Sequence, residues 1–449
     1  MTTRREFLKN SAIAASGLLL SPALAAQTWI GKKPQVIIMG AGLSGLAAAR
    51  VLQQRGIGYT LLEAQHRLGG RVFSHQMGNL TVELGGEWIG DSHERMCALC
   101  QEFRLDLDNN QMASGAIYKG RYFPKAESAY SPEWTARIAQ LLDDYRELPE
   151  ADKRLFDRYD WWRYLVNNGC TGRDLDLREL SDSTDFGESI RHVSAFAALE
   201  EYAMSSEKNE MDYKIAGGNE LLAHRIADKI GRQHIHLQHK VTRVVQHSNG
   251  VRVYCANGKM FEADKLICTL PTVALRHIQW EPGLAQNKVD AINQLQYARI
   301  NKHAVLFDRR FWPREDFDLL TDQLPHYFYH ATKNQRSSQG VLISYTIGDK
   351  AAVIANQDPA VNARHIVQTL QPHFGDIGPL IAKQENFYWG NHEYTRGAYA
   401  LYQPGQWFDL MPVLREDFLH TSFAGEHIAD WQGFMEGAVV TGETAALKI

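Results

Sequence analysis

The chain has 449 residues, of which 44% are hydrophobic, so it can bury a large core and form two or three globular domains. It carries 48 basic and 52 acidic side chains, and no dense Lys/Arg patch is interleaved with aromatic residues. This composition argues against a disordered chain and against nucleic acid as a partner.

The first 25 residues have the pattern of an export signal. Arg4-Arg5 is followed by an apolar run over 12–20 and then by Ala23-Leu24-Ala25, which suits a signal peptidase. The apolar run is well short of the roughly 20 residues that span a bilayer, which disfavours a membrane anchor; an ordinary helix is the other alternative. We interpret residues 1–25 as a twin-arginine signal peptide and expect the folded protein to be exported to the periplasm, with the twin-arginine machinery as a partner. Proteins that use this route commonly load a cofactor before export.

A βαβ unit opens the rest of the chain. The apolar strand Val36-Ile37-Ile38-Met39 runs into a glycine-rich turn, a helix continues to about Gln54, and a second strand, 59–62, ends at Glu63. The turn consists of Gly40, Ala41, Gly42, Leu43, Ser44 and Gly45. Its GxGxxG spacing allows a tight turn, close approach of a pyrophosphate to the helix N-terminus and close packing of helix and strand. Glu63 is placed to accept hydrogen bonds from a ribose, so the unit predicts a dinucleotide site.

NAD and FAD sites share this unit, so the choice between them depends on later residues. Glycine pairs follow at 69–70 and 85–86. They would permit close backbone approach to a second large group, as an extended FAD requires, although two hairpin turns would give the same pattern.

The middle of the chain alternates between helical and strand patterns. Residues 127–202 have a helical pattern rich in charged and aromatic residues, which suggests a separate helical layer. Alternating strands follow over 235–271, and a mixed region runs from about 280 to 394. A strand and turn at Ser422-Phe423-Ala424-Gly425-Glu426 precede a last helix that starts near Gly433.

The five cysteines do not form a recognisable metal or disulfide pattern. Cys97 and Cys100 have CxxC spacing but lie on a predicted amphipathic helix, where packed core thiols are more common than a redox pair. The remaining three have no metal ligands at suitable spacing, so we predict no structural metal site.

The stretch from Val36 to Gly90 resembles the flavin amine oxidase family, which includes monoamine oxidases, polyamine oxidases and L-amino acid oxidases. The segment Phe423-Ala424-Gly425-Glu426 and the segment Trp431 to Ala438 resemble it as well. The resemblance implies an α/β fold with a Rossmann-like FAD-binding domain of the glutathione reductase type and a substrate domain of mixed sheet plus helices. We expect the FAD-binding domain to comprise 34–110, 215–285 and 395–449, and the substrate domain to comprise 111–214 and 286–394.

The resemblance also implies contacts to the cofactor. On the adenosine side, Glu63 would bind the ribose, Val241 would contact the adenine, and Arg71 would lie near the pyrophosphate. On the flavin side, Glu426 would hydrogen bond with the ribityl chain, and Met435 would donate its backbone N–H to the flavin. Gly85, Gly86, Glu87 and Trp88 would border the flavin, and the predicted cofactor site also includes Ala64, Gly70 and Phe434. Gln65 is a departure, since relatives often carry Arg there, and it puts a minor adenosine contact in doubt.

On the reacting side of the flavin, the resemblance assigns catalytic positions to Lys302, Trp389, Tyr399 and Phe434. Lys302 would hold a water against the flavin N5 and assist the reaction with oxygen; an outward lysine on an edge strand is the alternative. Tyr399 matches one wall of an aromatic cage, and Phe434 stands where relatives have a second tyrosine. Ala398 replaces the cysteine that carries the flavin in mitochondrial monoamine oxidases, so the FAD should be non-covalent.

The predicted function is oxidation of a small primary or secondary amine by hydride transfer to flavin N5. The products would be an imine, then an aldehyde and ammonia, with hydrogen peroxide formed from O2. One alternative is an L-amino acid oxidase, which needs an arginine for the substrate carboxylate, with Arg191 or Arg396 as candidates. Others are a dehydrogenase that passes electrons to a periplasmic carrier and an exported flavoprotein that binds partners without turnover. The sequence leaves the amine and the oligomeric state open.

Overall fold

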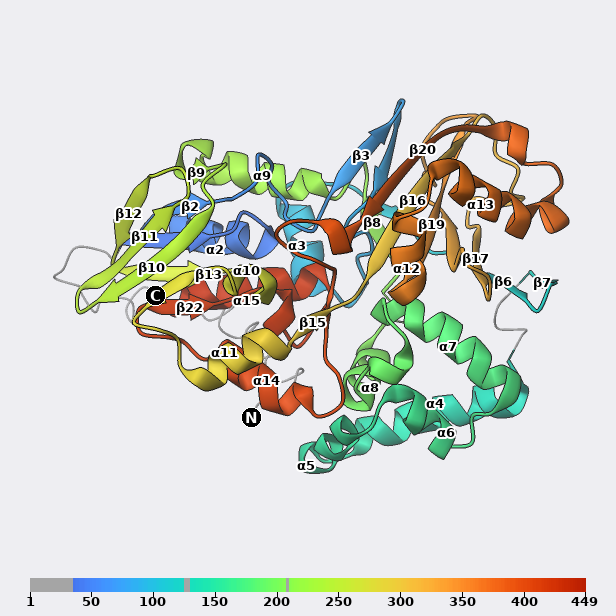
Figure 1. Cartoon of the computed structure of the whole chain (residues 1–449), viewed down its shortest axis with the longest axis horizontal. Helices are drawn as coiled ribbons and strands as arrows, with labels where there is room; N and C mark the ends of the chain where they lie inside the picture. Colours follow the sequence, from blue (N-terminus) through green and yellow to red (C-terminus); the bar gives the residue numbers. More distant parts are fainter. Residues whose placement is uncertain (1–34, 125–129, 207–209) are drawn as a thin grey trace.

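The computed structural model describes residues 35–124, 130–206 and 210–449, so the predicted signal peptide lies outside the described residues. Two lobes lie side by side (Figure 1). One contains a five-stranded sheet in the order β22-β13-β1-β2-β9, all parallel. Its strands are Thr421–Phe423, Lys265–Cys268, Gln35–Met39, Gly58–Leu62 and Ile235–His236. They come from the three stretches predicted to form the FAD-binding domain, and the structure is a mixed α/β fold.

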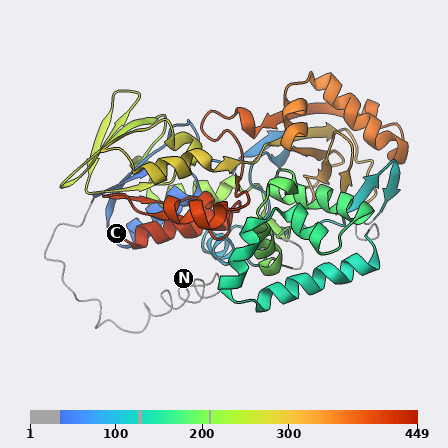
Figure 2. The ribbon, with the colours of Figure 1, turned by 60° about the horizontal axis from the view of Figure 1, so that its bottom comes forward.

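Both faces of this sheet are covered, as a parallel sheet requires. Side chains of β1 alternate: Val36 and Ile38 join one apolar core, and Ile37 and Met39 join another. The first core is shared with α2 (Leu43–Gln54), α3 (Glu94–Glu102), α9 (Glu220–Ile230) and α15 (Met435–Leu447). Figure 2 shows α15 beside the blue N-terminal segment, although the two are far apart in sequence.

The second core lies under a four-stranded sheet in the order β12-β11-β10-β14. These strands are Met260–Ala263, Gly250–Cys255, Val241–His247 and Gln279–Glu281. The helices α10 (Thr272–Leu275), α11 (Gln286–Gln294) and α14 (Gln406–Arg415) close this core. The sequence boundary near residue 285 assigns α11 to the substrate domain, but its apolar residues Ala291 and Ile292 pack with Leu410 of α14 in the dinucleotide lobe.

The other lobe is built on a seven-stranded sheet in the order β20-β16-β19-β18-β17-β6-β7. The strands are Ile381–Tyr388, Ile300–Phe307, Gly340–Ile347, Tyr327–His330, Asp318–Thr321, Gly115–Tyr118 and Arg121–Phe123. One face packs under α13 (Pro359–Phe374), and α12 (Gly348–Ala355) follows β19 directly. The other face carries Ala304, Tyr329 and Tyr345 and meets the hairpin β3 (Ser74–Met77) and β4 (Leu80–Glu83) of the first lobe.

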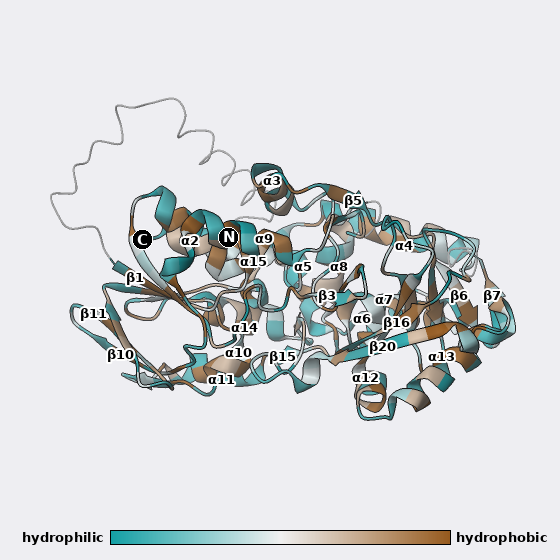
Figure 3. Ribbon diagram, turned by 90° about the horizontal axis from the view of Figure 1, so that it is seen from above, coloured by the Kyte–Doolittle hydropathy of each residue, from teal (hydrophilic) through white to brown (hydrophobic). Residues whose placement is uncertain are grey.

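The predicted helical layer lies below this sheet in Figure 1. It consists of α4 (Pro132–Glu147), α5 (Glu150–Lys153), α6 (Trp161–Asn167), α7 (Gly172–Phe186) and α8 (Ala195–Met204), and α4, α6, α7 and α8 share one apolar core. Two small pairings, β5 (Leu107–Asn109) with β8 (Tyr213–Ile215) and β15 (Gln296–Tyr297) with β21 (Ala400–Leu401), join distant segments. In Figure 3, surface helices such as α3 and α9 carry both brown and teal residues, as helices with one packed face do. No helix within the described ranges combines the length and apolarity needed to cross a membrane.

Candidate active site

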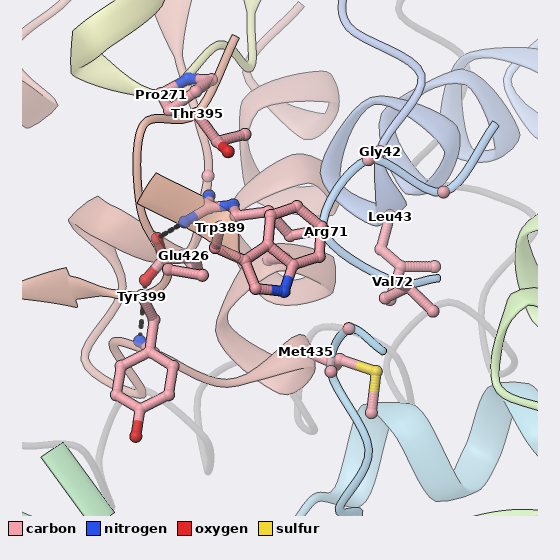
Figure 4. A pocket seen from close by; sticks show the side chains of 18 of the residues that line it. Gly42, Leu43, Arg71, Val72, Pro271, Trp389, Thr395, Tyr399, Glu426 and Met435 are labelled. Atoms are coloured by element: carbon pink, nitrogen blue, oxygen red, sulfur yellow. Dashed lines mark hydrogen bonds and ion pairs between the residues drawn. The ribbon is translucent and has the colours of Figure 1, made fainter. Parts of the chain in front are cut away.

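A cavity of about 360 Å³ runs from the glycine-rich turn into the substrate lobe. Nearly all predicted site residues line it: Gly40, Gly42, Leu43, Ser44, Glu63, Ala64, Gly70, Arg71, Gly85, Gly86, Glu87, Trp88, Val241, Lys302, Trp389, Tyr399, Glu426, Phe434 and Met435. Ala41 and Gly45 belong to the same glycine-rich turn but are not among the lining residues. Figure 4 shows Gly42 and Leu43 on one side of the cavity and Trp389 and Tyr399 on the other.

The glycines at the first end of the cavity are required by close backbone contacts. Gly40 has φ +104°, a conformation that favours glycine. A Cβ at Gly45 would lie 1.9 Å from the carbonyl oxygen of Gly40, so only glycine lets α2 pack this closely against the turn. Gly42 forms an isolated bridge with Gly69, which brings the glycine pair 69–70 against the glycine-rich turn.

Two helices begin at the cavity without a side-chain cap. Gly42 precedes α2 and Phe434 precedes α15, and neither provides a capping hydrogen bond. Helix N-termini carry unpaired N–H groups and a partial positive charge, which together bind anionic groups. The cavity therefore offers two anion-binding ends: one at the turn predicted to hold a pyrophosphate, and one near Met435.

Glu63 lies at the end of β2 and is buried. Its Oε2 accepts a hydrogen bond from the N–H of Ala41 at 2.7 Å, and its Oε1 accepts one from the N–H of Gln65 at 2.8 Å. Burial raises the pKa of this carboxyl. Each carboxylate oxygen can accept a further hydrogen bond, so the group could still receive ribose hydroxyls.

Arg71 and Glu426 form an ion pair that joins the first lobe's glycine segment to the C-terminal segment (Figure 4). The other oxygen of Glu426 accepts a hydrogen bond from the N–H of Gly433 at 2.8 Å, immediately before α15. This arrangement fixes the start of α15 relative to Arg71 and the cavity.

Lys302 is buried on the central strand β16, between β19 and β20, with a relative exposure of 3%. Its Nζ donates to the carbonyl oxygens of Glu83 at 3.1 Å and Gly85 at 2.9 Å and to Oε2 of Glu87 at 3.0 Å. The structure thus excludes the alternative of an outward lysine on an edge strand. Three protein acceptors match the three N–H groups of a lysine ammonium.

Glu87 is the centre of a buried polar cluster that sequence reasoning missed. In addition to Lys302, it accepts a hydrogen bond from the hydroxyl of Tyr329 at 2.5 Å, and Lys214 lies 3.9 Å from its Oε1. Asn219 donates to the carbonyl oxygens of Gly86 and Glu87 and so holds this segment. Burial and the charge of Glu87 raise the pKa of the neighbouring Glu83 to about 7.

The predicted aromatic residues all reach the cavity. Trp389 is buried and donates its Nε1–H to the carbonyl oxygen of Leu84 at 2.8 Å. Tyr399 donates its hydroxyl to the backbone oxygen of Asp185, and its ring packs over Gly433, where a Cβ would lie 3.1 Å from the ring. Phe434 makes edge contacts with the rings of His93 and Trp431. These contacts hold Tyr399 and Phe434 at the cavity wall.

The arginines considered for a substrate carboxylate lie elsewhere. Arg191 is exposed and stacks on Trp162, with its guanidinium 3.8 Å from the ring centre. Arg396 is also exposed. Among the described residues that line the cavity, Arg71 is the one arginine, and it is paired with Glu426.

The residues present fit an FAD. Two uncapped helix N-termini, a glycine cradle that a Cβ would fill and a buried acid at the end of β2 provide the donor and acceptor set that an extended dinucleotide needs. Trp389, Tyr399 and Phe434 form an aromatic wall in the same cavity, and this wall could contact a flat ring system.

Comparison with known proteins establishes the family. The family model for flavin containing amine oxidoreductases matches residues 43–449, so the chain belongs to this family. It is an FAD-dependent oxidoreductase that acts on amines.

Individual relatives are distant but match over most of their length. The chain is 24% identical to the flavin-containing amine oxidase B of Cavia porcellus, over 94% of this chain and 86% of the relative. It is 27% identical to a probable polyamine oxidase 4 of Arabidopsis thaliana, over 92% of this chain and 86% of the relative. Among solved structures, a putrescine oxidase double mutant gives a TM-score of 0.83 at 21% identity, over 93% of this chain and 98% of that chain. Cyclohexylamine oxidase from Brevibacterium oxydans gives a TM-score of 0.81 at 22% identity, over 93% of this chain and 98% of that chain.

Proposed function

We propose that the protein oxidises a small primary or secondary amine, without a substrate carboxylate, to an imine, with O2 as the electron acceptor and hydrogen peroxide as its product. Water hydrolyses the imine to an aldehyde and ammonia, or to an aldehyde and a primary amine where the substrate is a secondary amine. The observation that carries this proposal is the charge of the cavity wall. The wall contains the acids Asp185, Glu201, Glu210 and Asp318, whereas its one arginine is already paired. Such a wall attracts an ammonium group and repels a carboxylate, so it favours an amine over an amino acid.

The bound FAD would supply the chemistry by accepting a hydride from the amine α-carbon. The chain's own residues then have three tasks. Tyr399 and Phe434 supply aromatic faces that position the amine. The N-terminus of α15 favours negative charge at its end of the cavity. Lys302 places a positive charge, held by Glu87, at the cavity lining and supports the choice of O2 as the acceptor.

The test is an anaerobic titration of the flavin absorbance with tyramine and with tyrosine, followed by admission of air. The proposal expects tyramine to bleach the flavin and tyrosine to have little effect, with hydrogen peroxide formed on reoxidation. Bleaching by tyrosine alone would favour an L-amino acid oxidase. Reoxidation that requires an added electron carrier would favour a dehydrogenase, and no bleaching by any amine would favour a binding protein.

We also propose that the protein is exported to the periplasm by the twin-arginine route. The support is the sequence pattern of Arg4-Arg5, the short apolar run and Ala23-Leu24-Ala25. Replacing both arginines with lysine should move the flavoprotein from the periplasmic to the cytoplasmic fraction. An unchanged distribution between these fractions would contradict the proposal.

A further inference from the structure

Asp318 is a buried carboxylate in the cavity wall that forms no ion pair with another described residue. It is the first residue of β17, lines the cavity and has a relative exposure of 3%. Its Oδ2 accepts hydrogen bonds from the hydroxyls of Ser114 at 2.9 Å and Tyr327 at 2.8 Å. Its Oδ1 is buried and has no hydrogen-bond partner, and Asp318 forms no ion pair with any residue that the structure describes.

This environment is costly for an anion, because a buried charge needs a partner to offset its lost hydration. Burial raises the pKa of Asp318 to about 6, so the group still ionises near neutral pH. By contrast, the lining cations Arg71, Lys240 and Lys302 are each paired with a carboxylate of their own. None of these three cations is therefore paired with Asp318, and a cation that enters the cavity could form an ion pair with it.

A passage lined by tyrosines connects Asp318 to the aromatic wall. Tyr327, which bonds Asp318, lies edge-on to Tyr345, with their ring centres 6.4 Å apart. The side chains of Tyr345 and Tyr399 in turn lie close enough to shift each other's pKa. The side chains of Tyr327, Tyr345 and Tyr399 all line the cavity, and the charge of Asp185 acts on all three. Aromatic faces and a nearby carboxylate suit an extended chain that carries positive charge.

We propose that the substrate carries a second cationic nitrogen, as in an α,ω-diamine, and that Asp318 binds this distal ammonium while the C–N bond to be oxidised lies at Tyr399. This inference rests on the proposed amine oxidation and specifies its substrate class. The distal ammonium would donate a hydrogen bond to Oδ1 of Asp318, which has no partner among the described residues. A monoamine of the same length could not form this interaction. A charge-assisted hydrogen bond of this kind corresponds to a kcat/KM for the diamine that is about tenfold or more above that for the monoamine.

The test compares kcat/KM for putrescine and cadaverine with that for butylamine and pentylamine. The wild-type enzyme should prefer each diamine to its monoamine at least about tenfold, and the ratio should fall to near one in Asp318→Asn. Asp376→Asn, which removes one exposed carboxylate outside the cavity, is the matched control and should keep the wild-type ratio. Equal kcat/KM for diamines and monoamines in the wild type, or an unchanged ratio in Asp318→Asn, would overturn the proposal.

A second variant keeps the test decisive if Asp318→Asn fails to fold. Leu320 is two residues further along the same strand, so it shares a face with Asp318, and it also lines the cavity. Leu320→Lys would place a tethered ammonium beside the carboxylate and should abolish the diamine preference; retention of that preference would contradict the proposal.

The outcomes also separate this inference from the proposed function. If monoamines bleach the flavin as well as diamines do, the distal site fails and amine oxidation stands. If neither bleaches it, the proposed function itself fails.

Discussion

The residues that surround the Lys302 side chain come from segments that are far apart in the sequence. The lysine lies on β16, its acceptors lie in the segment 83–87, and the neighbouring Lys214 and Tyr329 lie on β8 and β18. Glu87 compensates the positive charge of Lys302 in a buried environment, where an unpaired charge would be very unfavourable. The pair keeps the lysine ammonium in one position, 5.3 Å from the centre of the Trp88 ring.

Replacing Glu87 with glutamine should destabilise the protein, because it leaves Lys302 and Lys214 as buried cations without their carboxylate. Loss of one partner of a buried pair costs about 3–5 kcal/mol. The double variant Glu87→Gln/Lys302→Met should lose less than the sum of the two single variants, because it removes the unpaired ammonium of Lys302 as well. Chemical unfolding of the four proteins gives this cycle, and strictly additive losses would contradict the pairing.

Among the elements, the two uncapped helices that meet the cavity are the main functional units. The N-terminus of α2 is pressed against the glycine turn, and the N-terminus of α15 is fixed by Glu426. Helix α15 also carries Glu436, whose carboxylate accepts hydrogen bonds from the N–H groups of Arg95 and Met96 in the first turn of α3. One helix thus caps another.

Gly45→Ala should separate α2 from the turn, because the new Cβ would lie 1.9 Å from the carbonyl oxygen of Gly40. We expect a loss of about 1–3 kcal/mol in stability and a marked loss of bound flavin. Gly283→Ala is a suitable control, since no atom lies within 4 Å of its Cβ position. The ratio of flavin to protein absorbance after purification measures the effect, and equal ratios for the two variants would refute it.

The cap on α3 should make stability depend on pH. Burial raises the pKa of Glu436 from its ordinary value of 4.5 to about 7. The folded protein therefore binds this proton more tightly than the unfolded chain does. The contribution of protonated Glu436 to the free energy of unfolding is complete below about pH 4.5 and is lost as the pH rises through about 7. Glu436→Gln cannot titrate, so its unfolding midpoint should rise relative to the wild type between pH 5 and pH 8. A constant difference across this range would show that Glu436 titrates normally.

Local sequence patterns predict much of the dinucleotide lobe. The alternation of 36–39, the glycine spacing and the acid at Glu63 define β1, α2 and β2 to within a residue or two, because these signals act over short distances. The polar cluster around Glu87 and the environment of Asp318 could not be predicted in this way. Ser114, Asp318 and Tyr327 meet only after β6, β17 and β18 pair, and no local pattern encodes that register. The motif Gly85-Gly86-Glu87 was the one available signal for an acid near the flavin segment.

At the scale of the whole molecule, the cavity couples the two lobes. Its lining includes the glycine turn of one lobe, Lys302 and Asp318 on the large sheet of the other, and Asp185 of the helical layer. A ligand that contacts all of these parts can be held only when they are assembled. Cofactor binding should therefore stabilise the fold as a unit.

Added FAD should raise the thermal unfolding midpoint of the apoprotein in a concentration-dependent manner, by the equivalent of about 2.7 kcal/mol at one hundred times Kd. Since Ala398 offers no sulfur for a covalent link, acid precipitation should release the yellow colour into the supernatant. A flavin that stays in the pellet would show a covalent attachment at another residue. A midpoint that does not respond to FAD would show that the cavity is not its site.

The position of β22 and α15 in the chain has a consequence for biosynthesis. The strand that completes the parallel sheet and the helix that ends at the cavity both come from residues 421–447. A nascent polypeptide cannot enclose a dinucleotide until these residues have left the ribosome, so loading of the prosthetic group must follow translation. Nonsense mutations anywhere upstream of this segment should yield a colourless product, however much of the remaining chain is made.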